Sequence, residues 1–210
     1  LVSAARLAHA GYSVDLFEKN AAVGGKMGRD TFDGCTFDTG PSLITMPFVL
    51  DEFFRSVGTS LEQELQLVPL DPACHYRWSD GTVLDMPSNK EAVPDALATI
   101  SPVVLDDGRA YLAEAEFLYA STKDVFLFAP FTAIREFFRP RNISLLRWLH
   151  RLRFTTTLHR ANRSFFSHPK LVQLFDRYAT YNGSSPYKAP GTLMVIPWVE
   201  IAYGAFYPVG

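Results

Sequence analysis

Three short motifs near the N-terminus constrain the fold of this chain more than any other feature. An alternating apolar segment ends in an acidic residue, Leu16-Phe17-Glu18. Gly24-Gly25-Lys26 comes six residues later, and Phe37-Asp38-Thr39-Gly40-Pro41 follows. The alanine-rich start over residues 3–10 has the composition of a helix, which Gly11 is placed to end. A helix, a strand, an acidic residue and a glycine pair in this order predict the second half of a βαβ unit.

The strand and glycine-rich turn that open such a unit do not precede this helix in the sequence. We therefore expect these 210 residues to be an internal piece of a larger protein. In complete units, an acidic residue at the end of the second strand hydrogen-bonds a ribose hydroxyl. Glu18 fits that role, although a surface glutamate can end any parallel strand. Gly24 and Gly25 let backbone N–H groups approach a phosphate, although glycine pairs also form plain turns.

The rest of the chain divides into short strands and then helices. Periodicity and turn residues predict strands over 12–18, 65–70, 74–78 and 82–86, an extended or hairpin segment over 31–37, and helices over 48–57, 90–100, 107–125, 170–180 and 191–203. A soft boundary falls near Asn89, where the section with strands gives way to a mostly helical one. Cys35 and Cys74 show no metal-ligand spacing, so we expect no metal site.

The motifs resemble those of a known enzyme family. Residues 16–27 and 37–41 are similar to FAD-dependent carotenoid desaturases of the bacterial phytoene desaturase type. Residues 175–187, with the run Tyr178-Ala179-Thr180-Tyr181-Asn182-Gly183, and residues 204–210 resemble later segments of the same family, in the same order. That run is most similar to the branch that forms 3,4-double bonds in hydroxylated carotenoids. The resemblance implies an FAD cofactor and a carotenoid precursor as substrate.

The resemblance also implies a fold and its domains. The fold class is α/β: an incomplete Rossmann-like FAD-binding domain of the glutathione-reductase-like flavoprotein type, with an inserted, mostly helical α+β domain. Residues 1–88 would form the partial FAD-binding domain, and residues 89–210 the substrate and membrane-associated domain. Because the cofactor domain is incomplete, we expect the isolated piece to bind FAD poorly and to be inactive.

Roles for single residues follow from the same resemblance. Glu18 would hold the adenosine ribose, and Gly24, Gly25 and Lys26 would line the phosphate and flavin side. Lys26 replaces the arginine common in the family, so it keeps the charge and loses the bidentate fork. Three further residues would lie near the isoalloxazine of the flavin: Asp38, Gly40 and Pro41.

The predicted reaction is flavin-dependent desaturation of phytoene or a hydroxycarotenoid, with quinone or oxygen as candidate electron acceptor. Glu136 between Arg135 and Arg139 would supply a carboxylate for the reaction; the alternative is an ion pair on a helix surface. Other possibilities are a related flavoprotein, such as a carotene isomerase or an amine oxidase, and a non-catalytic lipid-binding fragment. The isomerase would cycle its flavin without a net electron acceptor.

A basic and aromatic segment over residues 125–163 predicts contact with a membrane. Between Arg135 and Arg163 eight arginines stand against one acidic residue, Glu136, although the whole chain has a net charge of −2. Aromatic residues interleaved with arginines are typical of an interfacial helix, and the carotenoid substrate lives in a bilayer. We expect a peripheral, monotopic protein on the cytoplasmic side of a membrane. The alternative is an amphipathic helix packed on its own domain, and no nucleic-acid-binding module is recognisable.

Overall fold

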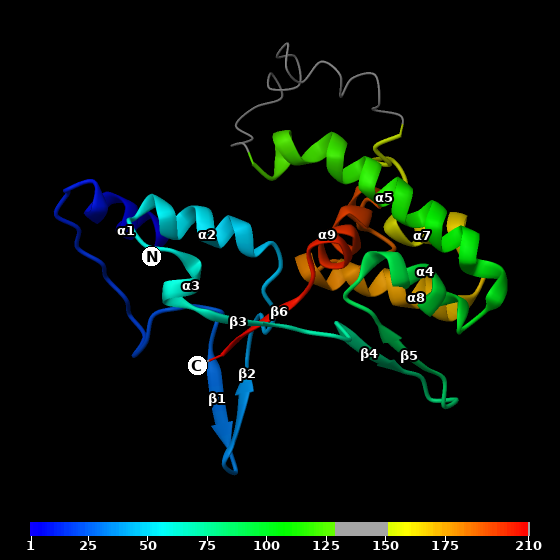
Figure 1. Cartoon of the computed structure of the whole chain (residues 1–210), viewed down its shortest axis with the longest axis horizontal. Coiled ribbons are helices and arrows are strands. Elements are labelled where there is room, and N and C mark those ends of the chain that lie inside the picture. The colour runs from blue at the N-terminus through cyan, green and yellow to red at the C-terminus, as the bar shows by residue number, and fades with distance from the viewer. Residues whose placement is uncertain (129–150, 210) are drawn as a thin grey trace. The chain divides into compact units, whose positions relative to one another are not determined.

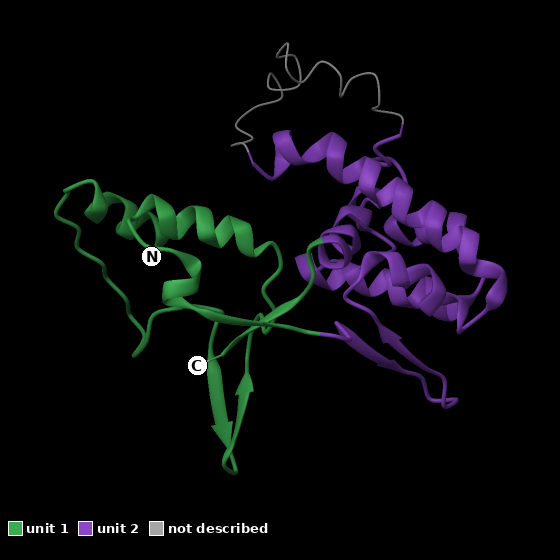
Figure 2. Ribbon diagram, viewed as in Figure 1, with its two compact units in different colours: residues 1–70, 203–210 green, residues 71–202 purple. Residues whose placement is uncertain are grey.

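The computed structural model describes residues 1–128 and 151–209 (Figure 1). The chain forms two compact units (Figure 2). Unit 1 contains residues 1–70 and 203–210, and unit 2 contains residues 71–202. The last residues of the chain therefore belong with the first seventy, and the segment between them forms a unit of its own.

Unit 1 combines three helices with two small antiparallel sheets. Its helices are α1 (Val2–His9), α2 (Pro47–Ser56) and α3 (Leu61–Glu64). Strands β1 (Arg29–Phe32) and β2 (Cys35–Asp38) form a hairpin. Strand β3 (Gln66–Pro69) pairs with β6 (Phe206–Val209) (Figure 1). Val68 lies opposite Tyr207. This pairing ties the end of the chain to unit 1.

Unit 1 has little hydrophobic core. Among the described residues its buried apolar side chains are Leu61 and Ala205. Phe17 is 94% exposed and Met27 is 70% exposed. Contacts between α1 and α2 are partly polar, since Arg6 Nε donates to Ser56 Oγ at 3.1 Å. The segment that carries the cofactor motifs is consequently held by few packing contacts, and it leaves apolar surface open.

Unit 2 is mostly helical. Strands β4 (Cys74–Arg77) and β5 (Val83–Met86) form its hairpin. The helices described in this unit are η1 (Lys90–Ala92), α4 (Val93–Ala98), η2 (Pro102–Val104), α5 (Leu105–Phe126), α7 (Leu158–Phe165), α8 (Pro169–Asp176), η5 (Arg177–Asn182), η6 (Gly191–Met194) and α9 (Val195–Tyr203).

An aromatic cluster forms the centre of unit 2. Tyr111 of α5 lies 4.1 Å, ring centroid to centroid, from Phe175 of α8. Phe166 stacks on Phe175 at 5.0 Å, and all three side chains are fully buried. Burying such a side chain contributes about 1.5–3 kcal/mol. This cluster fixes α7 and α8 against α5 and so positions the residues at the α7–α8 boundary.

Most predicted elements are confirmed. The hairpin in the 31–37 region, the 74–86 hairpin and the helices over 48–57, 107–125 and 191–203 all form, the last beginning as a 3₁₀ turn. The predicted strand over 12–18 is wrong: these residues belong to no ladder. A strand needs a hydrogen-bonded neighbour, and no described segment pairs with this one. The described sheets are all two-stranded and antiparallel.

The division into compact units differs in position from the predicted domains. Compactness separates the chain after Leu70 and again before Tyr203. The predicted cofactor-binding domain, residues 1–88, and the predicted substrate-binding domain, residues 89–210, stay a prediction.

Candidate functional site

A cavity of about 500 Å³ in unit 1 gathers three of the predicted cofactor residues. Glu18, Gly24 and Gly25 all line it, together with the start of α1. The other lining residues are Leu1, Val2, Ser3, Leu16, Phe17 and Val23. The acidic residue and the glycine pair are therefore neighbours in space.

The polar groups of this cavity suit the ribose and the diphosphate of a dinucleotide. Glu18 Oε1 accepts from Asn20 N at 2.8 Å, and a carboxylate can accept further bonds from a ribose diol. The first turn of α1 brings unpaired amides and the positive end of a helix dipole, which favour a phosphate. Gly25 has φ +60°, and a Cβ there would meet no protein atom within 4 Å. The residues present thus fit the adenosine and phosphate part of a dinucleotide.

The other predicted cofactor residues lie outside this cavity. Gly40 packs on the backbone of Lys26, since a Cβ on Gly40 would lie 1.8 Å from Lys26 O. Asp38 pairs with Arg29 at 3.4 Å, Nε to Oδ1, and Pro41 is exposed. The two glycine motifs therefore touch through their backbones. Their assigned contact with an isoalloxazine stays a prediction.

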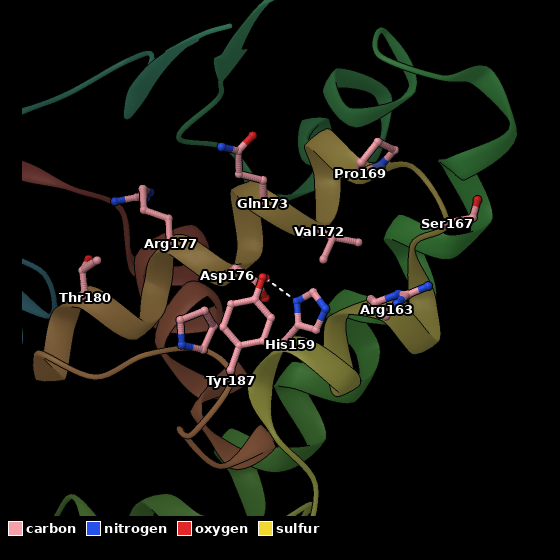
Figure 3. Close-up of a pocket in the computed structure, with 11 residues that line it drawn as sticks. His159, Arg163, Ser167, Pro169, Val172, Gln173, Asp176, Arg177, Thr180 and Tyr187 are labelled. Atoms are coloured by element: carbon pink, nitrogen blue, oxygen red, sulfur yellow. Dashed lines mark hydrogen bonds and ion pairs between the residues drawn. The ribbon is translucent and has the colours of Figure 1, made fainter.

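A second cavity, of about 650 Å³, lies in unit 2 (Figure 3). His159 and Arg163 of α7 face Val172, Gln173 and Asp176 of α8 across it. The remaining lining residues are Ser167, Pro169, Arg177, Thr180, Pro186 and Tyr187. The cavity has apolar walls and several polar groups, a combination typical of small-molecule sites.

A histidine–aspartate pair stands in this second cavity. His159 Nδ1 lies 2.6 Å from Asp176 Oδ2, and Asn162 Nδ2 donates to Asp176 Oδ1 at 2.8 Å. The ring of Tyr187 lies 4.5 Å from the imidazole (Figure 3). Because an ionised carboxylate only accepts, Nδ1 donates, and Nε2 of the neutral ring keeps its lone pair. This arrangement orients an imidazole that can accept a proton.

The buried carboxylate of Glu200 contacts the segment that includes the cavity residue Arg177. Glu200 is 4% exposed, and it accepts from Tyr178 Oη at 2.7 Å and from Tyr181 Oη. Arg177, which lines the cavity, places its Nη2 3.5 Å from Glu200. Burial raises the pKa of Tyr178 well above its usual value, and the neighbouring Glu200 raises it further. The segment 177–181 is therefore fixed by a network around one carboxylate.

Comparison with known proteins gives the family. The sequence pattern of the flavin containing amine oxidoreductases matches residues 1–193. The chain belongs to this family. Flavin is the cofactor that this family's description names. The polar groups of the first cavity, described above, fit the adenosine side of that cofactor.

Three curated relatives from this family are similar over the whole chain. The 1-hydroxycarotenoid 3,4-desaturase of Flavobacterium sp. (strain P99-3) is 38% identical over 210 residues. The 4,4'-diapolycopene oxygenase of Methylomonas sp is 33% identical over 214 residues, and the zeta-carotene-forming phytoene desaturase of Myxococcus xanthus is 30% identical over 210. All of this chain aligns in each, against 43%, 42% and 40% of the relatives. The chain spans about two fifths of their length.

The predicted catalytic group cannot be placed. Arg135, Glu136 and Arg139 lie outside the described residues, as does much of the basic and aromatic segment. Among the helices that the structure describes, none combines the length and the apolar character that a membrane span requires.

The sequence reasoning missed the His159–Asp176 pair. The two lie 17 positions apart in the sequence, and no local spacing links them. They meet because α7 and α8 pack together across the turn at residues 166–168. The resemblance already singled out the segment that contains Asp176, so the polar residues of that segment were the one available signal.

Proposed function

We propose that the complete protein is an FAD-dependent desaturase of a carotenoid precursor, either phytoene or a hydroxycarotenoid, in carotenoid biosynthesis. The observation that carries this proposal is the match of the whole chain to relatives named for carotenoid substrates. The first cavity supports it, because Glu18, Gly24 and Gly25 form the kind of surface that binds an adenosine diphosphate group. No observation favours an isomerase or an amine oxidase over a desaturase.

The proposed architecture assigns the two units different tasks. Unit 1 contributes part of a Rossmann-like FAD-binding domain, in which Lys26, Asp38, Gly40 and Pro41 lie on the flavin side. Unit 2 belongs to an inserted α+β domain that binds the substrate. Its second cavity, with apolar walls around His159, is the proposed place for the polyene near the bond that is oxidised.

The residues of this cavity suggest how a proton leaves. Desaturation removes a hydride equivalent from one carbon and a proton from its neighbour, and the electron pair of the second C–H bond becomes the new double bond. Bound flavin supplies the hydride acceptor. In our proposal Nε2 of His159 accepts the proton, and Asp176 holds the ring and stabilises the imidazolium that forms. Quinone or oxygen is the proposed final electron acceptor.

We also propose peripheral attachment to the cytoplasmic side of a membrane, and exposed apolar residues support the contact with lipid. Phe126, Leu127 and Phe128 at the end of α5 are 38%, 49% and 46% exposed. Phe154 is 41% exposed, and its ring lies 6.3 Å from that of Phe126. We call these four residues the apolar group. Aromatic and apolar side chains of this kind, next to arginines, suit a lipid interface.

Product analysis tests this function. The purified complete protein is incubated in detergent with phytoene or a hydroxycarotenoid, with and without a quinone. A desaturase forms a product with one more double bond and consumes the quinone. A product of unchanged mass formed without quinone would identify an isomerase instead.

A further inference from the structure

A third concave site, in unit 2, has the composition of an anion-binding site. The cavity has a volume of about 510 Å³, and Arg151, Arg153 and Arg160 line it. The other lining residues are Glu114, Thr155, Thr156 and Ser164. Three positive charges against one negative charge leave a formal charge of +2. Nothing in the cofactor or substrate sites described above uses this cavity.

The arginines are held in place before any ligand arrives. Glu114 places one carboxylate oxygen 3.0 Å from Arg151 Nη2 and the other 2.9 Å from Arg153 Nε. The Arg151 guanidinium lies 3.9 Å from the ring centre of Phe117, and that of Arg153 lies 5.2 Å from the ring centre of Phe165. Guanidinium groups that are fixed in advance lose less conformational entropy when they bind an anion.

Arg160 supplies one of the two positive charges that Glu114 leaves uncompensated. Among the described residues no carboxylate forms an ion pair with it, and its side chain is exposed. It lies in the first turn of α7, where Thr157 Oγ1 accepts from Arg160 N at 3.3 Å. The positive end of the α7 dipole adds to the same field.

We infer that this cavity binds a phosphate group. Arginine is the preferred partner of phosphate because its planar fork donates two parallel hydrogen bonds. Two hydroxyl-bearing residues, Thr155 and Thr156, add donors of the type that phosphate oxygens accept. The ligand is a phosphate monoester or diester, and a lipid headgroup or a free phosphate would supply the same chemistry.

The position of the cavity favours the lipid source. Phe154 of the apolar group lies in the chain between Arg153 and Thr155, which line the cavity. A single short segment therefore offers an apolar side chain and phosphate-binding groups together. A lipid phosphate seated here would leave its acyl chains beside the apolar group. This part of the inference rests on the proposed membrane attachment, whereas phosphate binding itself does not.

The test compares three arginine variants of the 210-residue chain. R160Q removes one of the two uncompensated charges, R160K keeps the charge without the fork, and R109Q removes an exposed arginine of α5 that pairs with Asp106 outside the cavity. Binding of inorganic phosphate is followed by amide chemical shifts of residues 153–160. Binding to vesicles of phosphatidylcholine, alone or with phosphatidic acid, is followed by sedimentation. Circular dichroism confirms that each variant is folded.

We expect R160Q to weaken phosphate binding by about tenfold or more, because a charge-assisted hydrogen bond to the phosphate is lost. R160K should be intermediate and R109Q unchanged. If vesicles with phosphatidic acid bind, and R160Q reduces this binding, the source is lipid. Phosphate binding without vesicle binding would keep the site and assign it to a free phosphate, and would count against membrane attachment alone. Equal behaviour of R160Q and R109Q towards phosphate would overturn the inference.

Discussion

The α-carbon of Gly40 lies directly against the carbonyl group of Lys26, so closely that a Cβ on Gly40 would approach that oxygen to 1.8 Å. Next to this contact, Thr39 N donates to Gly28 O at 2.9 Å. Two motifs separated in sequence therefore pack backbone to backbone. No residue other than glycine fits at position 40 without moving one of the two segments.

Replacing Gly40 with alanine is expected to separate these segments. Overpacking of this kind costs about 1–3 kcal/mol. Amide exchange of Thr39 should accelerate by roughly tenfold to a hundredfold, as seen by nuclear magnetic resonance. Gly34→Ala is the control. Gly34 has a positive φ, and a Cβ there would meet no atom within 4 Å, so this substitution introduces backbone strain without a steric clash. Unchanged exchange at Thr39 in Gly40→Ala would show that the contact is not formed in solution.

Glu18→Gln is expected to weaken FAD binding by the complete protein. The amide keeps the shape of the side chain but loses the charge that strengthens a hydrogen bond to the ribose. The loss should be about tenfold to a hundredfold in Kd, measured by quenching of flavin fluorescence. Glu52→Gln, an exposed change on α2, should leave the Kd unaltered. Equal affinity of Glu18→Gln and Glu52→Gln would remove Glu18 from the cofactor site.

His159→Gln is expected to slow desaturation by the complete enzyme by about 10²–10⁴-fold in kcat, because a positioned base is lost. Binding of the polyene, followed by tryptophan fluorescence, should change much less. The chain offers a matched control in His75, which also lies 2.6 Å from a carboxylate, Asp85, but on an exposed hairpin. His75→Gln should retain activity. A kcat for His159→Gln within threefold of the original would exclude this residue as the proton acceptor.

Alkaline pH is expected to destabilise unit 2 through the phenols around Glu200. Burial, and then the hydrogen bond to Glu200, raise the pKa of Tyr181, and burial raises that of Tyr178. The pKa values of these phenols in the folded chain lie above the unfolded value of about 10. The stability that the protonated phenols contribute is therefore fully present below about pH 10. It is lost as the pH rises through the folded-state values.

Urea unfolding at several pH values measures this effect. Tyr178→Phe, which removes the fully buried phenol of this network, should cost roughly 1–2 kcal/mol at neutral pH and should show a smaller further loss above about pH 10. Tyr12→Phe, an exposed change in unit 1, serves as the control. If the ultraviolet absorption shows all tyrosines ionising near pH 10 in the folded chain, the buried network is wrong.

The helices and hairpins were predictable because their signals are local. Apolar spacing identified α2 and most of α5, and the turn at Asp80-Gly81 identified the β4–β5 hairpin. The pairing of β6 with β3 was not predicted. The pattern of residues 65–70 predicts a strand, but it does not identify a partner that lies about 140 positions away. The strand over 12–18 failed for the complementary reason: its local pattern is strand-like, yet no described segment pairs with it.

The candidate sites show the same contrast. Glu18 and Gly24-Gly25, which line one cavity, could be singled out in the sequence because a nucleotide-binding turn is short and needs glycine at fixed offsets. Their role in cofactor binding stays a prediction. The His159–Asp176 pair depends on how α7 packs against α8. The Glu114–arginine cluster depends on how residues 151–153, which precede α7, lie against α5. Side chains brought together by helix packing have no fixed spacing in the sequence.

The absorption spectrum of the complete protein, purified in detergent, tests the central claim most directly. Under anaerobic conditions, phytoene or a hydroxycarotenoid is added to the oxidised enzyme. We predict a flavin spectrum that bleaches as a polyene product with red-shifted absorption appears. A complete protein without flavin, or with flavin that stays oxidised in the presence of both polyenes, would contradict the proposed desaturase.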